Sequence, residues 1–252
     1  MKRNETIMWE YPETPVIIGG VTYNVLAFWS LPFILLLLMQ GSFDNDAVKS
    51  GIEFAYHTIN FLAAVYIFRE YLKDSFINVE TNLKVFKEVV WESFLMIILA
   101  AIVLFCTCRL FLNEYVAAGA DGILPLFEME LFMYSGMLLD YRPILGTLGA
   151  ILMGPVTISC LYYATVFAPL GNKKPTLAYI IMAFCIAIPR LCNALTYWFW
   201  QEELVLYLVQ LPVHMLACRA YHKADTVWAP IAVLMMVNAV SSVALLILFT
   251  MA

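Results

Sequence analysis

The stretch GPVTISCLYYATVFAPLGNKK, residues 154–174, is apolar and carries no charged residue before Lys173. About 20 consecutive apolar residues are enough for a helix to cross a lipid bilayer. The middle of the stretch, ISCLYY at residues 158–163, nevertheless contains a serine and two tyrosines. Polar side chains inside a bilayer are costly and usually functional, although small and hydroxylated residues also pack helix interfaces there. The stretch therefore predicts a membrane-embedded helix whose centre is either a site or a packing surface.

The composition of the whole chain is that of a polytopic membrane protein. Of its 252 residues, 63% are hydrophobic and 13% are charged, whereas soluble domains average about 45–50% apolar and about 25% charged residues. We predict an all-α bundle of transmembrane helices, because single apolar stretches of sufficient length recur along the chain. The predicted spans, about seven by this criterion, are residues 17–41, 51–72, 91–112, 143–169, 176–199, 204–221 and 227–250.

Lysine and arginine indicate the orientation, because cytoplasmic loops of membrane proteins retain these residues. With the N-terminus in the cytoplasm, the outer side receives only Lys49 and Arg142 and is otherwise acidic. The cytoplasmic side receives Lys2, Arg3, Arg69, Lys73, Lys84, Lys87, Lys173, Lys174, Arg219 and Lys223. We therefore expect a cytoplasmic N-terminus. The net charge of -5 argues against binding of nucleic acid, which needs a basic patch.

The N-terminal transmembrane region, residues 1–142, contains two segments that are not predicted spans. Residues 73–90 alternate charged and apolar side chains, which predicts an amphipathic helix on the cytoplasmic membrane surface. A solvated connector explains the pattern equally well. Residues 113–142 form a predicted outer loop rich in methionine and aromatic residues. These side chains would suit a partner surface, although anchoring at the membrane interface explains them more simply.

Polar side chains gather in the last four predicted spans, within residues 143–252. With about 1.5 Å of rise per residue, Ser159, Arg190 and Asn238 lie about 15, 20 and 16 Å from the cytoplasmic ends of their helices. Three helices thus place polar groups at a similar depth, and one shared pocket is the simplest arrangement. The candidate pocket residues are Ser159, Tyr163, Arg190, Gln210, His214 and Asn238.

Arg190 is the most costly of these residues, because an arginine about halfway across a bilayer must find a partner or water. Pro189, directly before it, can free a backbone carbonyl nearby. The expected partner is Asn238, a tyrosine hydroxyl, Glu53 of the second span or a bound anionic headgroup.

From Gly154 onward the chain resembles the CPBP family, the CAAX-protease and bacteriocin-processing membrane proteins. Residues 217–240, ACRAYHKADTVWAPIAVLMMVNAV, are similar to the family's small-residue helix, basic turn, T-G-S-x-W-A-P-I run and His-x-x-x-Asn helix. Residues 154–174 follow the pattern A-P-I-x-E-E-x-x-F-R-G-x-x-F-x-x-L-x-x-K in length and apolar spacing. The resemblance implies a CPBP-protease-like four-helix core over residues 143–252 and a location in a bacterial plasma membrane.

The family consists of glutamate-dependent intramembrane endopeptidases, and this chain departs from its catalytic pattern. The family's Glu-Glu pair falls on Ile158 and Ser159, and the arginine of the same motif falls on Tyr163. Its Phe-x-x-x-His pair falls on Ile186 and Arg190. Its final histidine and asparagine fall on Leu234 and Asn238. Isoleucine and serine cannot take a proton from water at neutral pH. Ser159 could act as a nucleophile only beside a base such as Lys173 or His214. The resemblance therefore implies a non-catalytic member.

We expect a pseudo-enzyme that serves as a scaffold or regulatory subunit and binds membrane lipids and an integral-membrane protein partner. One alternative is an active CAAX-type endopeptidase with a divergent site, and the other is a transporter or lipid-handling subunit with a pathway through Arg190 and His214. For the active peptidase, the candidate bases are Glu53, Glu70, Glu88 and Glu92.

No cofactor and no metal are expected. The six cysteines lie inside predicted spans, where buried cysteine usually behaves as a small hydrophobe. A metal site built from Cys185, Cys192 and His214 would lack the close ligand pair that is typical of zinc sites.

Overall fold

The computed structural model describes residues 12–29, 46–111, 149–171, 173–197 and 200–251. This part of the chain forms eleven helical elements, which join into seven continuous helices, and no strand, which confirms the predicted all-α class. In chain order the helices are α1 (Thr14–Tyr23), η1 (Asn24–Trp29), α3 (Asp46–Thr81), α4 (Leu83–Phe111), η2 (Gly149–Met153), α9 (Gly154–Ile158), η3 (Ser159–Phe167), α10 (Ala168–Gly171), α11 (Pro175–Tyr197), α12 (Trp200–Ala224) and α13 (Trp228–Met251).

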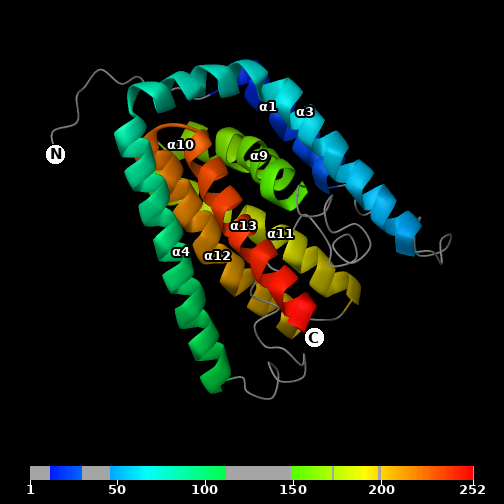
Figure 1. Cartoon of the computed structure of the whole chain (residues 1–252). Helices are drawn as coiled ribbons and strands as arrows, with labels where there is room; N and C mark the ends of the chain where they lie inside the picture. The colour runs from blue at the N-terminus through cyan, green and yellow to red at the C-terminus, as the bar shows by residue number, and fades with distance from the viewer. Residues whose placement is uncertain (1–11, 30–45, 112–148, 172, 198–199, 252) are drawn as a thin grey trace.

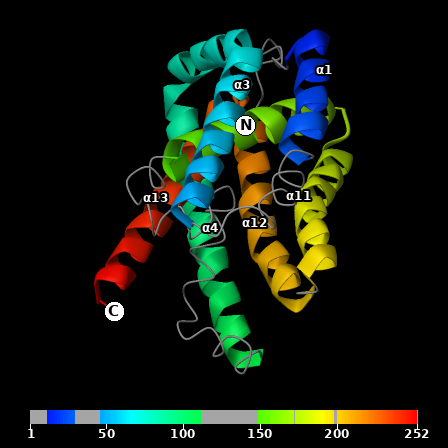
Figure 2. The same cartoon turned by 90° about the vertical axis from the view of Figure 1, so that its right-hand side faces the viewer.

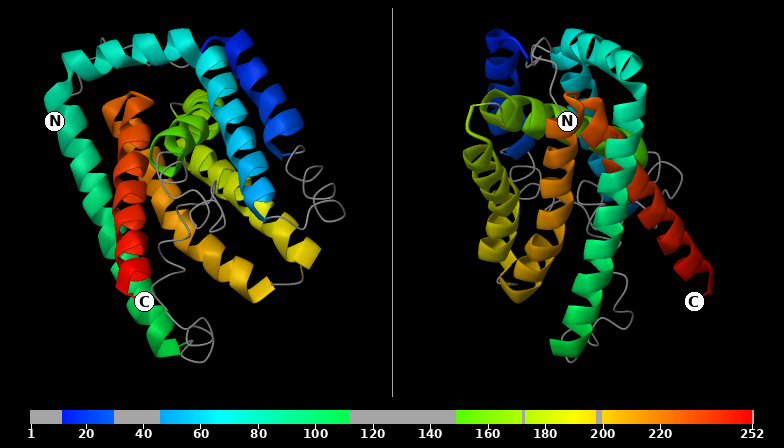
Figure 3. Two further views of the ribbon diagram at one scale, coloured as in Figure 1. Left: turned by 45° about the vertical axis from the view of Figure 1, so that its right-hand side comes forward. Right: turned by 90° about the vertical axis from the view of Figure 1, so that its left-hand side faces the viewer.

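The run from η2 to α10 is one continuous helix over residues 149–171, here named the crossing helix. Helices α4, α11, α12 and α13 run along the length of the molecule, and α12 packs against the other three. The crossing helix lies across these helices near one end (Figures 2 and 3). Helix α3 rises beside α1, bends and passes along that same end to reach α4 (Figure 1). The turns at residues 81–83, 171–175 and 224–228 lie there, so we name it the turn end.

Residues 73–90, predicted as one amphipathic helix, are divided between two helices. Helix α3 continues to Thr81, and α4 begins at Leu83 after a break at Asn82. At this break the hydroxyl of Thr81 lies within hydrogen-bond distance of the carbonyls of Ile77 (3.1 Å) and Asn78 (3.2 Å). The Asn78 carbonyl also accepts from the amide of Asn82 (3.1 Å). The predicted outer loop, residues 113–142, lies outside the described residues.

Within the described residues, one helical stretch, Ile151–Gly171, is long and apolar enough to cross a membrane. Shorter apolar stretches occupy Thr14–Leu26, Pro175–Ile188 and Trp228–Val240. The stretch Ile151–Gly171 belongs to the crossing helix, and 72% of its most apolar window is buried inside the molecule. The predicted fourth span therefore lies across α11 and α12 rather than alongside them. Since a buried core helix has the same length and composition as a span, the seven-span topology stays a prediction.

The hydrophobic core lies where the crossing helix meets α3, α11, α12 and α13. The largest fully buried side chains come from these elements and include Phe68, Leu161, Tyr163, Phe167, Met182, Ile231 and Leu234. A helix that is surrounded by other helices is apolar on every side. Burial of most of its surface explains why the stretch Ile151–Gly171 shows no polar face in the sequence.

A buried group of hydrogen bonds attaches the turn between α12 and α13 to the C-terminal part of α3. The Thr226 hydroxyl donates to the carbonyl oxygen of Ser75 (2.9 Å), and the Ser75 hydroxyl lies 2.8 Å from Thr226 Oγ1. Because the Thr226 proton is already used, Ser75 is the donor in that second bond. Ser75 Oγ then accepts from the amide of Val227 (3.1 Å), and Thr226 Oγ1 accepts from the amide of Trp228 (3.3 Å). The assignment uses each hydroxyl proton once and caps the first turn of α13.

Two further features shape this turn. The indole of Trp228 donates to the Leu72 carbonyl (2.8 Å), one turn of α3 before Ser75. Asp225 adopts a left-handed backbone conformation, with φ of 55°, which aspartate tolerates better than most residues other than glycine. The chain therefore reverses direction between α12 and α13 while remaining attached to α3.

Gly20 lets α1 approach both α3 and the crossing helix closely. A Cβ atom at this position would lie 2.4 Å from Thr165 Cγ2 and 2.7 Å from Phe68 Cζ. Both distances are shorter than any normal contact between carbon atoms. A Cβ atom at the neighbouring Gly19 would meet only Ile67 Cγ2, at an ordinary 3.8 Å. Only glycine fits at position 20.

The substitution Thr226→Val is expected to lower the free energy of unfolding by about 1–3 kcal/mol, because it leaves buried partners of the hydroxyl without hydrogen bonds. Thr226→Ser keeps the hydroxyl and is the matched control. Thermal or denaturant unfolding of the purified protein measures both. Equal stability of the two variants would contradict the hydrogen-bond assignment.

The substitution Gly20→Ala is expected to destabilise the fold by about 1–3 kcal/mol through overpacking. Gly19→Ala is expected to raise stability by up to about 1 kcal/mol, since alanine is the better helix former and has room there. The two variants should therefore shift the unfolding midpoint in opposite directions. A shift in the same direction for both would show that α1 does not approach its neighbours as described.

Candidate functional site

The structure joins two of the predicted pocket residues directly. The hydroxyl of Tyr163, in η3 of the crossing helix, lies 2.7 Å from Nδ1 of His214 in α12. Both side chains are buried, and Tyr163 is fully so. Either the phenol donates to an unprotonated Nδ1, or a protonated Nδ1 donates to the phenol oxygen. In both cases Nδ1 of His214 is engaged with Tyr163.

The other predicted pocket residues lie one helical turn away or on the next helix. Ser159 precedes Tyr163 by four residues, and Gln210 precedes His214 by four, so each pair shares a helix face. Ser159, Gln210 and Asn238 are all buried. Arg190 belongs to α11, but its side chain lies outside the described part of the structure, as does that of its proposed partner Glu53.

Ser159 has the most unusual environment of these residues. Its side chain is completely buried, and its hydroxyl has no hydrogen-bond partner among the described residues. A serine nucleophile needs an adjacent base to take its proton. Of the two candidate bases, His214 directs Nδ1 to Tyr163, and Lys173 is exposed. The described contacts therefore do not form a serine–histidine pair.

Three positions that the predicted resemblance aligns with catalytic motifs carry apolar side chains inside the molecule. Ile158, Ile186 and Leu234 are all buried, and Ile158 and Leu234 belong to the continuous hydrophobic core. None of these side chains can accept a proton or orient water.

The carboxylates considered as alternative bases lie on the surface where the structure describes them. Glu92 forms ion pairs with Arg219 and Lys223 on α12, at 2.8 and 3.0 Å. Glu70 lies 3.6 Å from Arg69, and both side chains are largely exposed. Glu88 is exposed as well. These described carboxylates are thus not neighbours of the buried Tyr163.

The carbonyl of Leu161 accepts two side-chain hydrogen bonds inside the π-helical segment η3. One comes from Asn24 Nδ2 in η1 (3.0 Å), and the other comes from Thr165 Oγ1 one turn later. π-Helical turns are rare and occur often at functional sites. The sequence offered one signal for this contact, a lone asparagine in the apolar first predicted span, and our sequence interpretation missed it.

Aromatic side chains lie between this site and the turn end. The ring of Phe167 packs edge-on against Tyr179 and Tyr221, with centroid distances of 5.1 and 6.0 Å. The hydroxyl of Tyr221 forms a buried hydrogen bond with that of Tyr71 in α3. The Tyr23 hydroxyl donates to Asn60 Oδ1 (2.6 Å) and links α1 to α3. Like the contact of Asn24, this bond was not predicted from the sequence.

Among the described residues, no group of three or more His, Cys, Asp or Glu side chains converges as a metal site would require. Of the candidate ligands, Cys185 is half-buried in α11 and His214 is bonded to Tyr163. The side chain of Cys192 lies outside the described part.

The chain matches no family model, no curated protein and no solved structure. The resemblance to the CPBP family, and the catalytic or non-catalytic role that it implies, stays a prediction.

The substitution Tyr163→Phe is expected to lower the free energy of unfolding by about 1–3 kcal/mol, because buried Nδ1 of His214 loses its partner. Tyr179→Phe is the matched control, since it removes the same atom from a half-buried ring. Thermal unfolding in one detergent compares the two. A control variant as unstable as Tyr163→Phe would contradict a special role for the Tyr163–His214 bond.

Proposed function

We propose that the chain is an integral membrane protein that binds another membrane protein as a scaffold or regulatory subunit and does not cleave it. This proposal has two parts, a location in the membrane and a core without peptidase chemistry. Each part has its own support.

The location in the membrane is supported by apolar side chains that point outward from helix after helix. On α4, the side chains of Trp91, Leu95, Leu99, Ile102 and Val103 are between 48% and 62% exposed and follow one helical stripe. On α11, Ile180, Phe184 and Leu191 are exposed in the same way. Soluble monomers rarely expose apolar patches that extend so far. In a bilayer, the acyl chains of lipid would cover these apolar faces, so that they would not be exposed to water.

The charge distribution supports the same location and gives it an orientation. Lys84 and Lys87 begin α4, Lys173 and Lys174 precede α11, and Lys223 ends α12. All of them lie close to the turn end, where the positive-inside rule would place the cytoplasm. A cytoplasmic N-terminus is consistent with this distribution of lysines.

A core without peptidase chemistry is supported by the contacts of the candidate site. Hydrolysis of a peptide bond needs a base placed to activate water or a nucleophile. The matched positions Ile158 and Leu234 are apolar, and Nδ1 of His214 is occupied by Tyr163. If the helices are arranged as in the peptidases that the chain resembles, the surface that binds the transmembrane segment of a substrate would remain after the catalytic groups are lost. Binding without cleavage is the role that remains.

Membrane fractionation followed by a cleavage assay tests the proposal. The protein is expected to remain in the membrane pellet after alkaline carbonate washing, because its apolar faces are inserted. Reconstituted in liposomes with labelled transmembrane peptides, it is expected to release no product above the level of empty liposomes. The variants Ser159→Ala and His214→Asn should likewise release no product above the level of empty liposomes.

Two results would refute the proposal in different ways. Extraction of the protein by carbonate would exclude insertion in the membrane. Cleavage that is lost on Ser159→Ala would instead establish the alternative of a working peptidase with a divergent site.

A further inference from the structure

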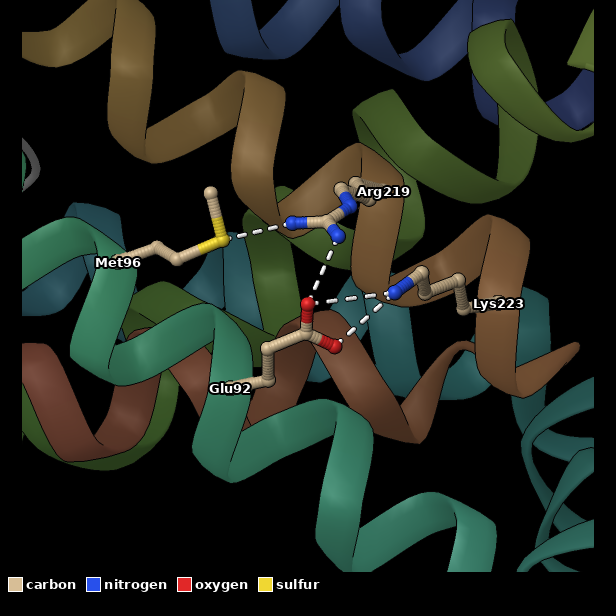
Figure 4. Close-up of polar contacts among 4 residues, drawn as sticks. All are labelled: Glu92, Met96, Arg219 and Lys223. Carbon is tan, nitrogen blue, oxygen red and sulfur yellow. Dashed lines mark hydrogen bonds and ion pairs between the residues drawn. The ribbon is translucent and has the colours of Figure 1, made fainter.

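A cluster of charged side chains joins α4 to α12 near the turn end (Figure 4). Glu92 of α4 accepts from Arg219 Nη2 at 2.8 Å and from Lys223 Nζ at 3.0 and 3.3 Å. The second guanidinium nitrogen, Nη1 of Arg219, lies 2.7 Å from the sulfur of Met96. Arg219 and Lys223 are four residues apart on α12, as are Glu92 and Met96 on α4, so two helix faces meet here.

The charges of this cluster do not balance. Two cations share one carboxylate, which leaves one formal positive charge. The side chains of Arg219, Lys223 and Glu92 are 32%, 40% and 45% exposed, so both cations retain donors that can reach a group outside the protein. Ion pairs at such exposure contribute little to stability. Holding α4 against α12 therefore does not account for a second cation.

The surface beside the cluster is apolar. Leu95 and Leu99 are exposed along α4 on the side away from the turn end, within the stripe that the proposed function places in lipid, and Met96 is exposed beside them. Lys84 and Lys87, together with Glu88, are exposed on α4 toward the turn end, where the two lysines outnumber the carboxylate. A positive site thus lies at the boundary between a basic end and an apolar stripe. That combination matches a phosphate group attached to an acyl chain.

We propose that Arg219 and Lys223 bind the phosphate of an anionic phospholipid whose acyl chain lies along Leu95 and Leu99 of α4. Arginine presents paired donors that suit phosphate oxygens, and basic sites between membrane helices on the cytoplasmic side bind anionic headgroups. Glu92 orients the two cations and at the same time competes with the phosphate for them. The inference rests on the proposed location in the membrane.

Because Glu92 competes with the phosphate, the inference predicts the direction in which a substitution of Glu92 changes the affinity for lipid. Replacing Glu92 by glutamine removes the competing charge and leaves both cations available to the lipid. If the cluster only held the helices together, Glu92→Gln would weaken the structure and any lipid contact together. If the cluster binds lipid, Glu92→Gln strengthens the binding.

The test is a titration of the detergent-purified protein with phosphatidylglycerol or phosphatidylcholine, with bound lipid counted by mass spectrometry of the intact complex. The wild type is expected to prefer phosphatidylglycerol. The double variant Arg219→Gln, Lys223→Gln should lose about tenfold in affinity for it, because each basic group near the headgroup contributes to binding. Glu92→Gln should bind phosphatidylglycerol more tightly than the wild type does.

Controls separate a specific site from general attraction to the basic end. Lys173→Gln with Lys174→Gln removes the same charge from exposed positions before α11 and should leave the affinity unchanged. Lys223→Gln alone keeps the Arg219–Glu92 pair and replaces the double variant if that variant does not elute as a monodisperse species.

Three outcomes would overturn the inference: equal binding of the two lipids, an equal loss in the Lys173/Lys174 control, or weaker binding by Glu92→Gln. Inorganic phosphate bound as tightly as the lipid would overturn the assignment to phospholipid. Extraction of the protein by carbonate would refute the proposed function itself. Retention in the membrane without a lipid preference would refute this inference alone.

Discussion

The hydrogen bonds between Ser75 and Thr226 fix the arrangement of helices on which the rest of the structure depends. They attach the turn before α13 to α3, although the two residues lie far apart in the chain. With α3 held across the turn end, α4 descends on one side and packs against α12. The contact is buried and fully bonded, so loss of either hydroxyl leaves polar groups without partners. Its position also brings Glu92 of α4 opposite Arg219.

The crossing helix is the second determinant of the architecture. It supplies Tyr163 to the candidate site and Phe167 to the aromatic contacts near the turn end. Its carbonyl at Leu161 is bonded from both η1 and its own next turn, within a π-helical segment. Because other helices cover most of its surface, the segment is apolar around most of its circumference. The exposed apolar stripe of α4 and the mostly buried apolar crossing helix are thus different features of the same chain.

Of the six residues predicted to share a pocket, the structure describes a direct contact between two, Tyr163 and His214. Ser159, Tyr163, Gln210, His214 and Asn238 are polar residues within apolar segments, and the structure buries all of them. The bond between Tyr163 and His214 could not be derived from depth along each helix, because depth says nothing about which faces meet. Asn24 was missed for a related reason, since its partner is a backbone carbonyl of another helix, which carries no signal in the sequence. For Arg190, depth in the predicted span remains the basis of its assignment.

The sequence by itself determined the helical class and the approximate extent of the helices, since hydropathy and charge follow the chain locally. It also determined which residues are basic near the three turns at the turn end. Only the tertiary structure decided that residues 149–171 cross the other helices, that Asn82 separates α3 from α4 and that Glu92 meets Arg219. These features depend on which helix faces come together, and hydropathy records how apolar a segment is but not what surrounds it.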